Sequence, residues 1–185
     1  QRAGAPVAAE LQRFAGEHGR RLHLEIEPGT YFVANAGALV STVQDVVDTG
    51  AKGYRFIKLD AGMTEVLRPS LYGAQHPLRL VRAEPDAPPE AGTVDYVVVG
   101  HCCESGDVLT PEPGNPESLA PRPLPAAQVN DLLLVGGCGA YCATMPAKNY
   151  NSFPEAAETL RDQSGQVHLI RRRQTLDQMV ANEVL

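Results

Sequence analysis

The N-terminal part of the chain combines a helical pattern with a strand-like one. Apolar residues recur every three or four positions across residues 6–18, which predicts a helix capped by Gly19. Residues 21–27 then alternate between polar and apolar side chains, as in a strand that ends at the turn residues 28–29. A helix, a short connection and a strand form the repeating step of an alternating α/β fold, whose chemistry lies at strand ends. Glu27 occupies such an end.

The pattern becomes β-rich from residue 38 onward. Short apolar runs separated by turn residues predict further strands. These cover 38–47, 55–60, 79–84, 94–99, 131–136 and 166–172. The stretches 85–92 and 111–125 are rich in Pro and polar residues, which predicts surface loops, and helical spacing returns only over 176–184. We therefore predict an α/β tail, then a β-rich domain, then a closing helix.

The composition is that of a soluble globular protein. The chain has 185 residues, of which 43% are hydrophobic and 21% charged, so it can bury a sizeable core. Its formal net charge of −6 argues against a general nucleic-acid surface, and the basic run 171–173 resembles a solvated strand end. We find no apolar run of membrane-spanning length and no signal pattern at residue 1. We expect a cytoplasmic protein that binds neither nucleic acid nor membrane.

The densest cluster of reactive side chains is the run His-Cys-Cys-Glu-Ser-Gly-Asp at 101–107. It follows an apolar run, so a strand delivers thiols, carboxylates and a hydroxyl to one loop, where nucleophiles and proton carriers can be held rigidly. Three other interpretations fit this run less well than a catalytic loop does: a structural zinc site, a disulfide and the nucleophile of a cysteine protease. Adjacent cysteines without a C-x2-C pair suit zinc poorly, a disulfide to Cys138 or Cys142 needs an oxidising compartment, and no protease-like context surrounds Cys103.

Three further motifs could bind a ligand, and each has a structural alternative. The turn after Glu27 places a carboxylate beside a bare glycine backbone, but an ordinary strand-ending turn has the same composition. Arg68 and Tyr72 are four residues apart and would share one side of a helical turn, either as a carboxylate clamp or as a surface ion-pair site. Tyr141 follows a Gly-dense run and is either a ligand contact or a core aromatic.

Six motifs follow one another in order along the chain. They are Glu27-Pro28-Gly29, Asp60-Ala61-Gly62-Met63, Arg68-Pro69-Ser70-Leu71-Tyr72, Cys103-Glu104-Ser105-Gly106-Asp107, Gly139-Ala140-Tyr141 and Asn149-Tyr150-Asn151. With this order, the chain resembles the C-terminal half of the diaminopimelate decarboxylases, pyridoxal-phosphate enzymes of the alanine-racemase-like class. The resemblance implies the C-terminal part of a TIM-type barrel over 1–37, a β-sandwich or β-barrel domain over 38–175 and a closing helix over 176–185.

The resemblance also implies roles around pyridoxal 5′-phosphate. Glu27 would pair with the pyridine nitrogen and keep it protonated, which makes the ring an electron sink when CO2 leaves. Gly29 through its backbone and Tyr141 through its hydroxyl would hold the phosphate, with Thr30 beside them in the cofactor site. The implied reaction converts meso-diaminopimelate to L-lysine and CO2.

The remaining implied roles concern the substrate. Arg68 and Tyr72, together with Tyr141, would grip its distal end. Cys103 would donate a proton near the reacting carbon, and Glu104 would act beside it and bind the substrate. In the family this Cys–Glu segment reaches into the neighbouring subunit, which implies a homodimer with two shared active sites.

Two departures from the family pattern bear on these expectations. Many relatives carry Arg where this chain has Thr30, which keeps the related D-ornithine/D-lysine decarboxylases open as an alternative. The family's Schiff-base lysine has no counterpart, because Lys52, Lys58 and Lys148 match no such context; we therefore expect a fragment that is inactive without the N-terminal half of the enzyme. A non-catalytic dimerisation or binding domain is the other alternative. His101 stands where relatives commonly have proline, and we interpret it as a loop residue.

Overall fold

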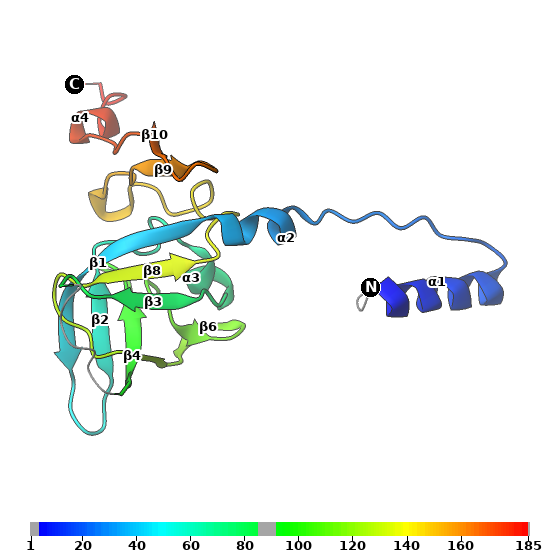
Figure 1. The fold of residues 1–185 in the computed structure, drawn as a ribbon, viewed down its shortest axis with the longest axis horizontal. Helices are drawn as coiled ribbons and strands as arrows, with labels where there is room; N and C mark the ends of the chain where they lie inside the picture. The colour runs from blue at the N-terminus through cyan, green and yellow to red at the C-terminus, as the bar shows by residue number, and fades with distance from the viewer. Residues whose placement is uncertain (1–3, 85–91, 185) are drawn as a thin grey trace.

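A six-stranded sheet forms the centre of the computed structural model, which describes residues 4–84 and 92–184 (Figure 1). The strands lie in the order β3-β8-β1-β2-β4-β7, and neighbours run antiparallel except β2 and β4, which are parallel. Their bounds are β1 Ala38–Asp48, β2 Arg55–Leu59, β3 Leu78–Val81, β4 Val94–Val99, β7 Arg122–Leu124 and β8 Leu132–Gly136. All but the last of the predicted strands belong to this sheet, so the predicted β-rich domain is confirmed.

Apolar side chains from this sheet form one core. Ile57, Val98 and Leu133 are fully buried in it, and β8 alternates between buried and half-buried positions along its length. The Tyr96 ring is buried beside them, and its hydroxyl accepts a hydrogen bond from the Ala127 N–H at 3.2 Å. Burying one such side chain stabilises the fold by about 1.5–3 kcal/mol. The core therefore gives the loops at the strand ends a rigid support.

The Pro-rich stretch 111–125 contains three short strands, so its prediction as a surface loop is wrong. β5, Pro111–Glu112, pairs with β6, Asn115–Leu119, and β7 pairs with β4. β7 is the last strand in the sheet order, and an edge strand tolerates a residue such as Pro123 that lacks a backbone N–H. Of the other predicted loop, residues 85–91 lie outside the described residues.

A two-stranded ribbon and a short helix follow the sheet. β9, Glu158–Arg161, pairs antiparallel with β10, Val167–Arg171, which is the predicted strand at 166–172. The helix α4 covers only Leu176–Met179 and not the predicted 176–184. None of its residues is buried, and a short helix without tertiary packing is marginal in water. No helix among the described residues has the length and apolar character needed to cross a membrane.

The N-terminal region contains the predicted helix but not the predicted strand. α1 spans Gly4–His18, with Gly19 at φ +66° as its cap. The strand predicted at 21–27 is wrong, because residues 20–28 have no regular structure and are exposed. A strand needs a neighbour to pair its backbone groups, and no described strand pairs with this segment. Figure 1 shows it as an extended connection between α1 and the rest of the chain.

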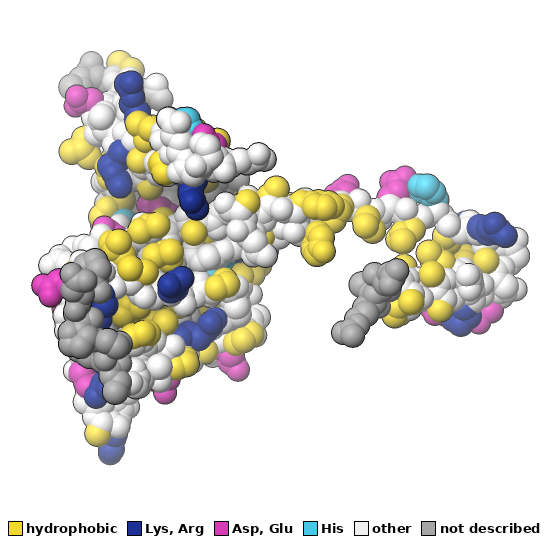
Figure 2. All heavy atoms as spheres, in the orientation of Figure 1, with side chains coloured by type: hydrophobic (Ala, Val, Ile, Leu, Met, Phe, Trp, Pro, Cys, Tyr) yellow, Lys and Arg dark blue, Asp and Glu magenta, His cyan; other side chains and the backbone are white. Residues whose placement is uncertain are grey.

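Two short helices join this connection to β1. α2 spans Gly29–Val33 and η1 spans Ala34–Ala36. Apolar side chains are exposed along this part of the chain, among them Ile26 at 72% and Phe32 at 73% (Figure 2). The division into a barrel part over 1–37, a β-domain over 38–175 and a closing helix stays a prediction.

Candidate functional site

The loop of residues 101–107, called the thiol loop from here on, is fixed by the carboxylate of Asp107. This side chain is buried and accepts hydrogen bonds from the backbone N–H groups of Cys102 at 2.9 Å and Met63 at 2.7 Å. Gly100 leads from β4 into the loop, and a Cβ there would lie 2.2 Å from the Asp107 carboxylate. The close approach explains the glycine. The buried acid thus ties the end of β4 to the loop that follows β2.

The two neighbouring thiols of this loop have different environments. Cys103 is exposed, whereas Cys102 is half-buried. Burial, followed by the nearby Asp107 carboxylate, raises the pKa of Cys102 to about 12, so this thiol stays protonated at neutral pH. The structure therefore leaves Cys103 as the accessible sulfur of the pair.

Glu104 is an exposed carboxylate held by three donors. Its Oε1 accepts from the Gly106 N–H at 3.0 Å and the Ser105 hydroxyl at 3.3 Å, and its Oε2 accepts from the Tyr150 hydroxyl at 3.3 Å. These bonds, led by the one from Gly106, lower the pKa of Glu104, while the carboxylate raises the pKa of Tyr150. Glu104 is therefore an anion beside the Cys103 thiol at neutral pH.

A tight turn around η2, Tyr150–Ser152, supports the thiol loop from another part of the chain. The Asn151 Oδ1 atom accepts a hydrogen bond from the Cys103 N–H at 2.9 Å. Asn149 and Asn151 have φ of +58° and +51°, a left-handed conformation that asparagine tolerates better than most residues. The Asn-Tyr-Asn motif thus provides both the turn and the side chain that meets Cys103.

Arg68, Tyr72 and Tyr141, together called the clamp, gather at the helix α3, Arg68–Tyr72. The Arg68 guanidinium lies 5.1 Å from the centre of the Tyr72 ring and 5.3 Å from that of Tyr141. α3 ends at Gly73, whose φ of +63° forms a left-handed cap. Both tyrosine rings are about half exposed. The clamp therefore offers a cation and two hydroxyl groups to solvent.

The loop that carries Tyr141 also holds the backbone after α2. The Gly139 N–H donates to the Ala34 carbonyl at 2.9 Å, and a Cβ on Gly139 would lie 1.8 Å from the Val33 carbonyl oxygen. Only glycine permits this approach. Gly29 and Thr30, which begin α2, are thereby linked through α2 to the loop of the clamp, whereas Glu27 lies in the exposed connection before it.

Two groups of predicted site residues are not joined in the described structure. Across residues 4–84 and 92–184, no hydrogen bond, ion pair or ring contact connects Cys103 or Glu104 with the clamp or with Glu27. The lysines lie elsewhere: Lys58 pairs with Asp45 and Lys148 with Glu155, both on the surface, and Lys52 lies in the turn between β1 and β2.

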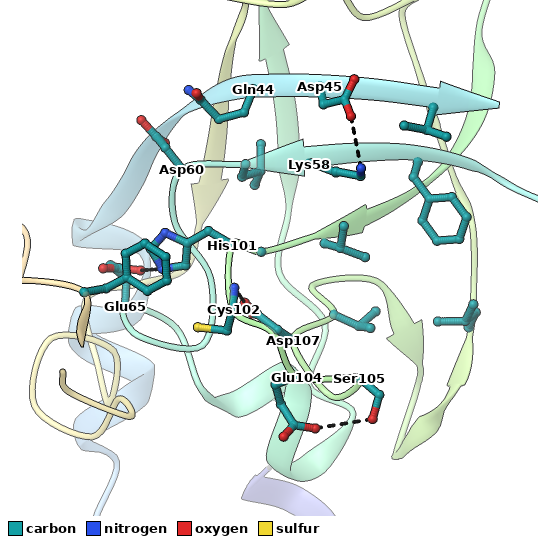
Figure 3. Close-up of a pocket in the computed structure, with 18 of the residues that line it drawn as sticks. Gln44, Asp45, Lys58, Asp60, Glu65, His101, Cys102, Glu104, Ser105 and Asp107 are labelled. Atoms are coloured by element: carbon teal, nitrogen blue, oxygen red, sulfur yellow. Dashed lines mark hydrogen bonds and ion pairs between the residues drawn. The ribbon is translucent and has the colours of Figure 1, made fainter. Parts of the chain in front are cut away.

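A cavity of ≈ 920 Å³ lies beside the thiol loop (Figure 3). Cys102, Glu104 and Ser105 contribute to its lining from the loop, and the Asp45–Lys58 pair contributes from β1 and β2. All four cysteines are free thiols, and no group of three metal-ligating side chains occurs among the residues that the structure describes. The cavity thus presents carboxylates, the Lys58 ammonium group and one protonated thiol.

Sequence reasoning missed four residues that hold the thiol loop. They are His101, Asp107, Tyr150 and Asn151. All four lie in stretches that the sequence had singled out, but nothing in the local pattern indicated that the Asn-Tyr-Asn segment would contact Cys103.

The chain is similar to known proteins over nearly its whole length. Residues 30–139 match the model of the "Pyridoxal-dependent decarboxylase, C-terminal sheet domain" family. The chain is 40% identical over 177 residues to the diaminopimelate decarboxylase of Escherichia coli K12, covering 96% of this chain and 41% of that protein. A crystal structure of diaminopimelate decarboxylase superposes with a TM-score of 0.77 at 39% identity, covering 94% and 40% of the two chains.

A third relative is the diaminopimelate decarboxylase of Helicobacter pylori, solved in complex with L-lysine. It superposes with a TM-score of 0.65 at 30% identity, covering 82% of this chain and 33% of that one. The chain therefore spans about two fifths or less of the length of these relatives. The matched residues include α2 from Thr30 onward, all six strands of the central sheet and the whole thiol loop. This chain belongs to the pyridoxal-dependent decarboxylase family, as its C-terminal sheet domain.

Proposed function

We propose that this chain is part of a pyridoxal-phosphate-dependent diaminopimelate decarboxylase, which converts meso-diaminopimelate to L-lysine and CO2. The observation that carries the proposal is the thiol loop: an exposed thiol beside an ionised carboxylate, both on a loop that a buried acid fixes to the sheet. Family membership and the 40% identity to the E. coli enzyme support the same conclusion.

The residues of the α2 region and the clamp fit part of the cofactor. Glu27 offers a carboxylate to a protonated ring nitrogen, and Thr30 and Tyr141 offer hydroxyl groups to a phosphate. Gly29 has open space around it, since a Cβ there would meet nothing within 4 Å, so its backbone is accessible to an anion. When bound, pyridoxal phosphate supplies the electron sink for the charge left by departing CO2.

The aldehyde end of the cofactor needs a lysine that these regions do not provide. Lys58 and Lys148 are held in surface ion pairs, and no contact links Lys52 to the α2 region or the clamp within the described residues. We propose that the remainder of the enzyme, which this chain does not span, supplies that lysine.

The clamp and the thiol loop would contact different parts of the substrate. Arg68 would bind a distal carboxylate, with Tyr72 and Tyr141 orienting it, because a guanidinium between two phenols can donate to both oxygens of such a group. Glu104 would bind an ammonium group, and Cys103 would donate the proton to the carbon that loses CO2. L-Lysine, which is bound in the H. pylori relative, is the product of the proposed reaction.

We propose a homodimer with shared sites, and the separation of the two groups supports this proposal. Cys103 and Glu104 are exposed and share no contact with the clamp of their own chain within the described residues, so the thiol loop of a second copy would complete each site. We propose the cytoplasm as the location, where free thiols stay reduced.

The substrate is tested on the whole enzyme that contains this chain, loaded with pyridoxal phosphate. We expect CO2 release from meso-diaminopimelate, and Cys103→Ala should lower kcat by about 10²–10⁴-fold, the usual range for a lost general acid. Turnover of D-lysine or D-ornithine instead would favour the alternative that Thr30 leaves open. Thr30→Arg should then shift preference toward the dicarboxylate. Absence of cofactor absorbance would favour a non-catalytic domain.

A further inference from the structure

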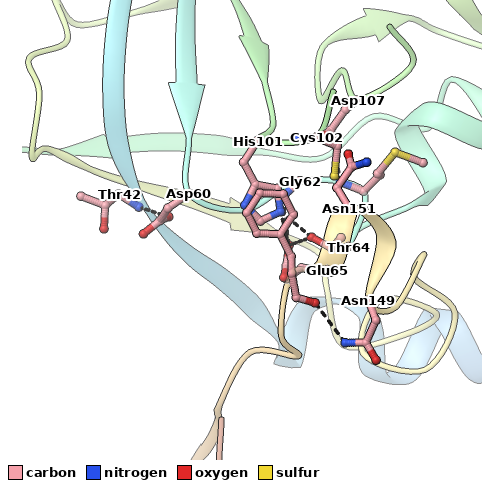
Figure 4. Close-up of polar contacts among 12 residues, drawn as sticks. Thr42, Asp60, Gly62, Thr64, Glu65, His101, Cys102, Asp107, Asn149 and Asn151 are labelled. Carbon is pink, nitrogen blue, oxygen red and sulfur yellow. Dashed lines mark hydrogen bonds and ion pairs between the residues drawn. The ribbon is translucent and has the colours of Figure 1, made fainter. Parts of the chain in front are cut away.

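His101 opens the thiol loop, and its side chain is only 14% exposed. The ring lies between the loop that follows β2 and the turn at η2 (Figure 4). The sequence predicted a loop residue at this position, and the structure shows in addition that the side chain of this loop residue is enclosed. The edge and the face of the imidazole contact different parts of the chain.

The edge of the ring is hydrogen-bonded to Thr64. His101 Nε2 lies 2.7 Å from the Thr64 hydroxyl, which in turn lies 2.6 Å from Glu65 Oε2. A carboxylate can only accept, so the single hydroxyl hydrogen of Thr64 goes to Glu65. The hydroxyl oxygen then accepts from His101, and Nε2 must carry a hydrogen. The tautomer of the ring follows from this count.

The Glu65 carboxylate is buried and depends on its hydrogen-bond donors. Its side chain is 9% exposed, and the same Oε2 also accepts from the Gly62 N–H at 2.9 Å. A buried carboxylate that loses a donor is destabilised, because no water replaces the missing bond. The bond from His101 thus orients Thr64 toward an acid that needs its hydroxyl.

The face of the ring is stacked on Phe153. The ring centres are 3.6 Å apart and the planes differ by 9°. Phe153 ends the turn at η2, and its carbonyl accepts from the Asn149 side chain at 3.0 Å. The same turn presents Asn151 to the Cys103 N–H. The His101 ring therefore packs against the same turn that holds the Cys103 amide.

We infer that His101 is a positioning residue for Cys103 and Glu104. Its Nε2–H ties the start of the thiol loop to Thr64, and its ring fixes the turn whose Asn151 holds the Cys103 amide. The inference rests on the proposed roles of Cys103 and Glu104. It assigns His101 no contact with substrate and no part in proton transfer.

The test compares two substitutions at position 101 in the whole enzyme. His101→Phe keeps a ring for stacking but removes the donor, and His101→Gln keeps an N–H donor of similar reach. We expect His101→Phe to speed hydrogen exchange of the Cys103 amide and lower kcat about tenfold, whereas His101→Gln stays within about threefold of the parent in both measurements. His168→Gln, at an exposed histidine of β10, serves as the control and should match the parent.

A second pair of substitutions examines the partner. Thr64→Val should reproduce the effect of His101→Phe, Thr64→Ser should not, and the double variant His101→Phe/Thr64→Val should be no worse than either alone. The inference is overturned if His101→Phe keeps parental exchange and kcat, or if His101→Gln is as impaired as His101→Phe. If even the parent decarboxylates nothing, the proposed function fails, while amide exchange still decides the role of His101.

Discussion

The two regions that carry proposed site residues are held in different ways. The thiol loop is closed onto the sheet by the buried Asp107, and Asn151 holds it from a distant turn. The segment 20–28, which carries Glu27, is exposed throughout and has no regular structure. The positions of Cys103 and Glu104 are therefore set by contacts within this chain, whereas the described contacts do not fix that of Glu27.

The difference has a simple physical origin. A buried carboxylate with two backbone donors loses a charge-assisted hydrogen bond when either donor moves away, and water does not replace that bond. An exposed segment exchanges its backbone bonds with water at little cost. Apolar residues such as Ile26, 72% exposed, gain nothing there unless another surface covers them.

The largest expected effect contrasts the core with the exposed segment. Leu133→Ala should lower the free energy of unfolding by about 2–5 kcal/mol, because it opens a cavity beneath the sheet. Leu24→Ala, at a side chain that is 54% exposed, should change it by less than about 0.5 kcal/mol. Urea unfolding followed by circular dichroism measures both. Equal losses at the two sites would show that segment 20–28 is packed after all.

The next effect concerns the anchor of the thiol loop. Asp107→Asn should cost about 1–3 kcal/mol in unfolding free energy, because the new amide nitrogen would face a backbone N–H in place of an acceptor. Glu27→Gln is the matched control in the exposed segment and should leave stability unchanged. Calorimetry on the two variants decides, and a neutral Asp107→Asn would mean that the loop is held without its buried acid.

A smaller effect separates the two adjacent thiols. Iodoacetamide at pH 8 should label Cys103 more than about tenfold faster than Cys102, since Cys102 is half-buried and its pKa of about 12 leaves little thiolate. Peptide mapping by mass spectrometry distinguishes the neighbours. Faster labelling of Cys102 would contradict the assignment of Cys103 as the accessible sulfur.

The smallest effect lies in the ribbon outside the sheet. Hydrogen bonds, first from Ser164 and then from His168, lower the pKa of Asp162 to about 2. A depressed carboxyl pKa stabilises the folded state above the unfolded value of about 3.9, and this contribution disappears as pH falls through about 2. Between these two pH values, the free energy of unfolding should fall more steeply with decreasing pH in the parent than in Asp162→Asn. Identical slopes would refute the shift.

Prediction from the sequence succeeded where local periodicity meets a common core. The runs that became β1, β2, β4 and β8 alternate or are continuously apolar, so their burial could be expected without knowing their partners. It failed at 21–27, where the alternation is strand-like but no described partner exists. It also failed at β7, whose prolines conceal an edge strand that only pairing with β4 reveals.

The features of the candidate site also fall into those that the sequence determined and those that it did not. The sequence by itself determined which residue types stand in which order, and hence the family, because a helix turn places Arg68 near Tyr72 and a strand end carries Cys103 whatever the rest of the fold does. Only the tertiary structure decided that Cys102 is the covered thiol, that Tyr141 shares the Arg68 guanidinium, and that Asn151 meets the Cys103 amide. These outcomes depend on contacts between residues far apart in the chain, and such contacts leave no periodicity in the sequence to be read.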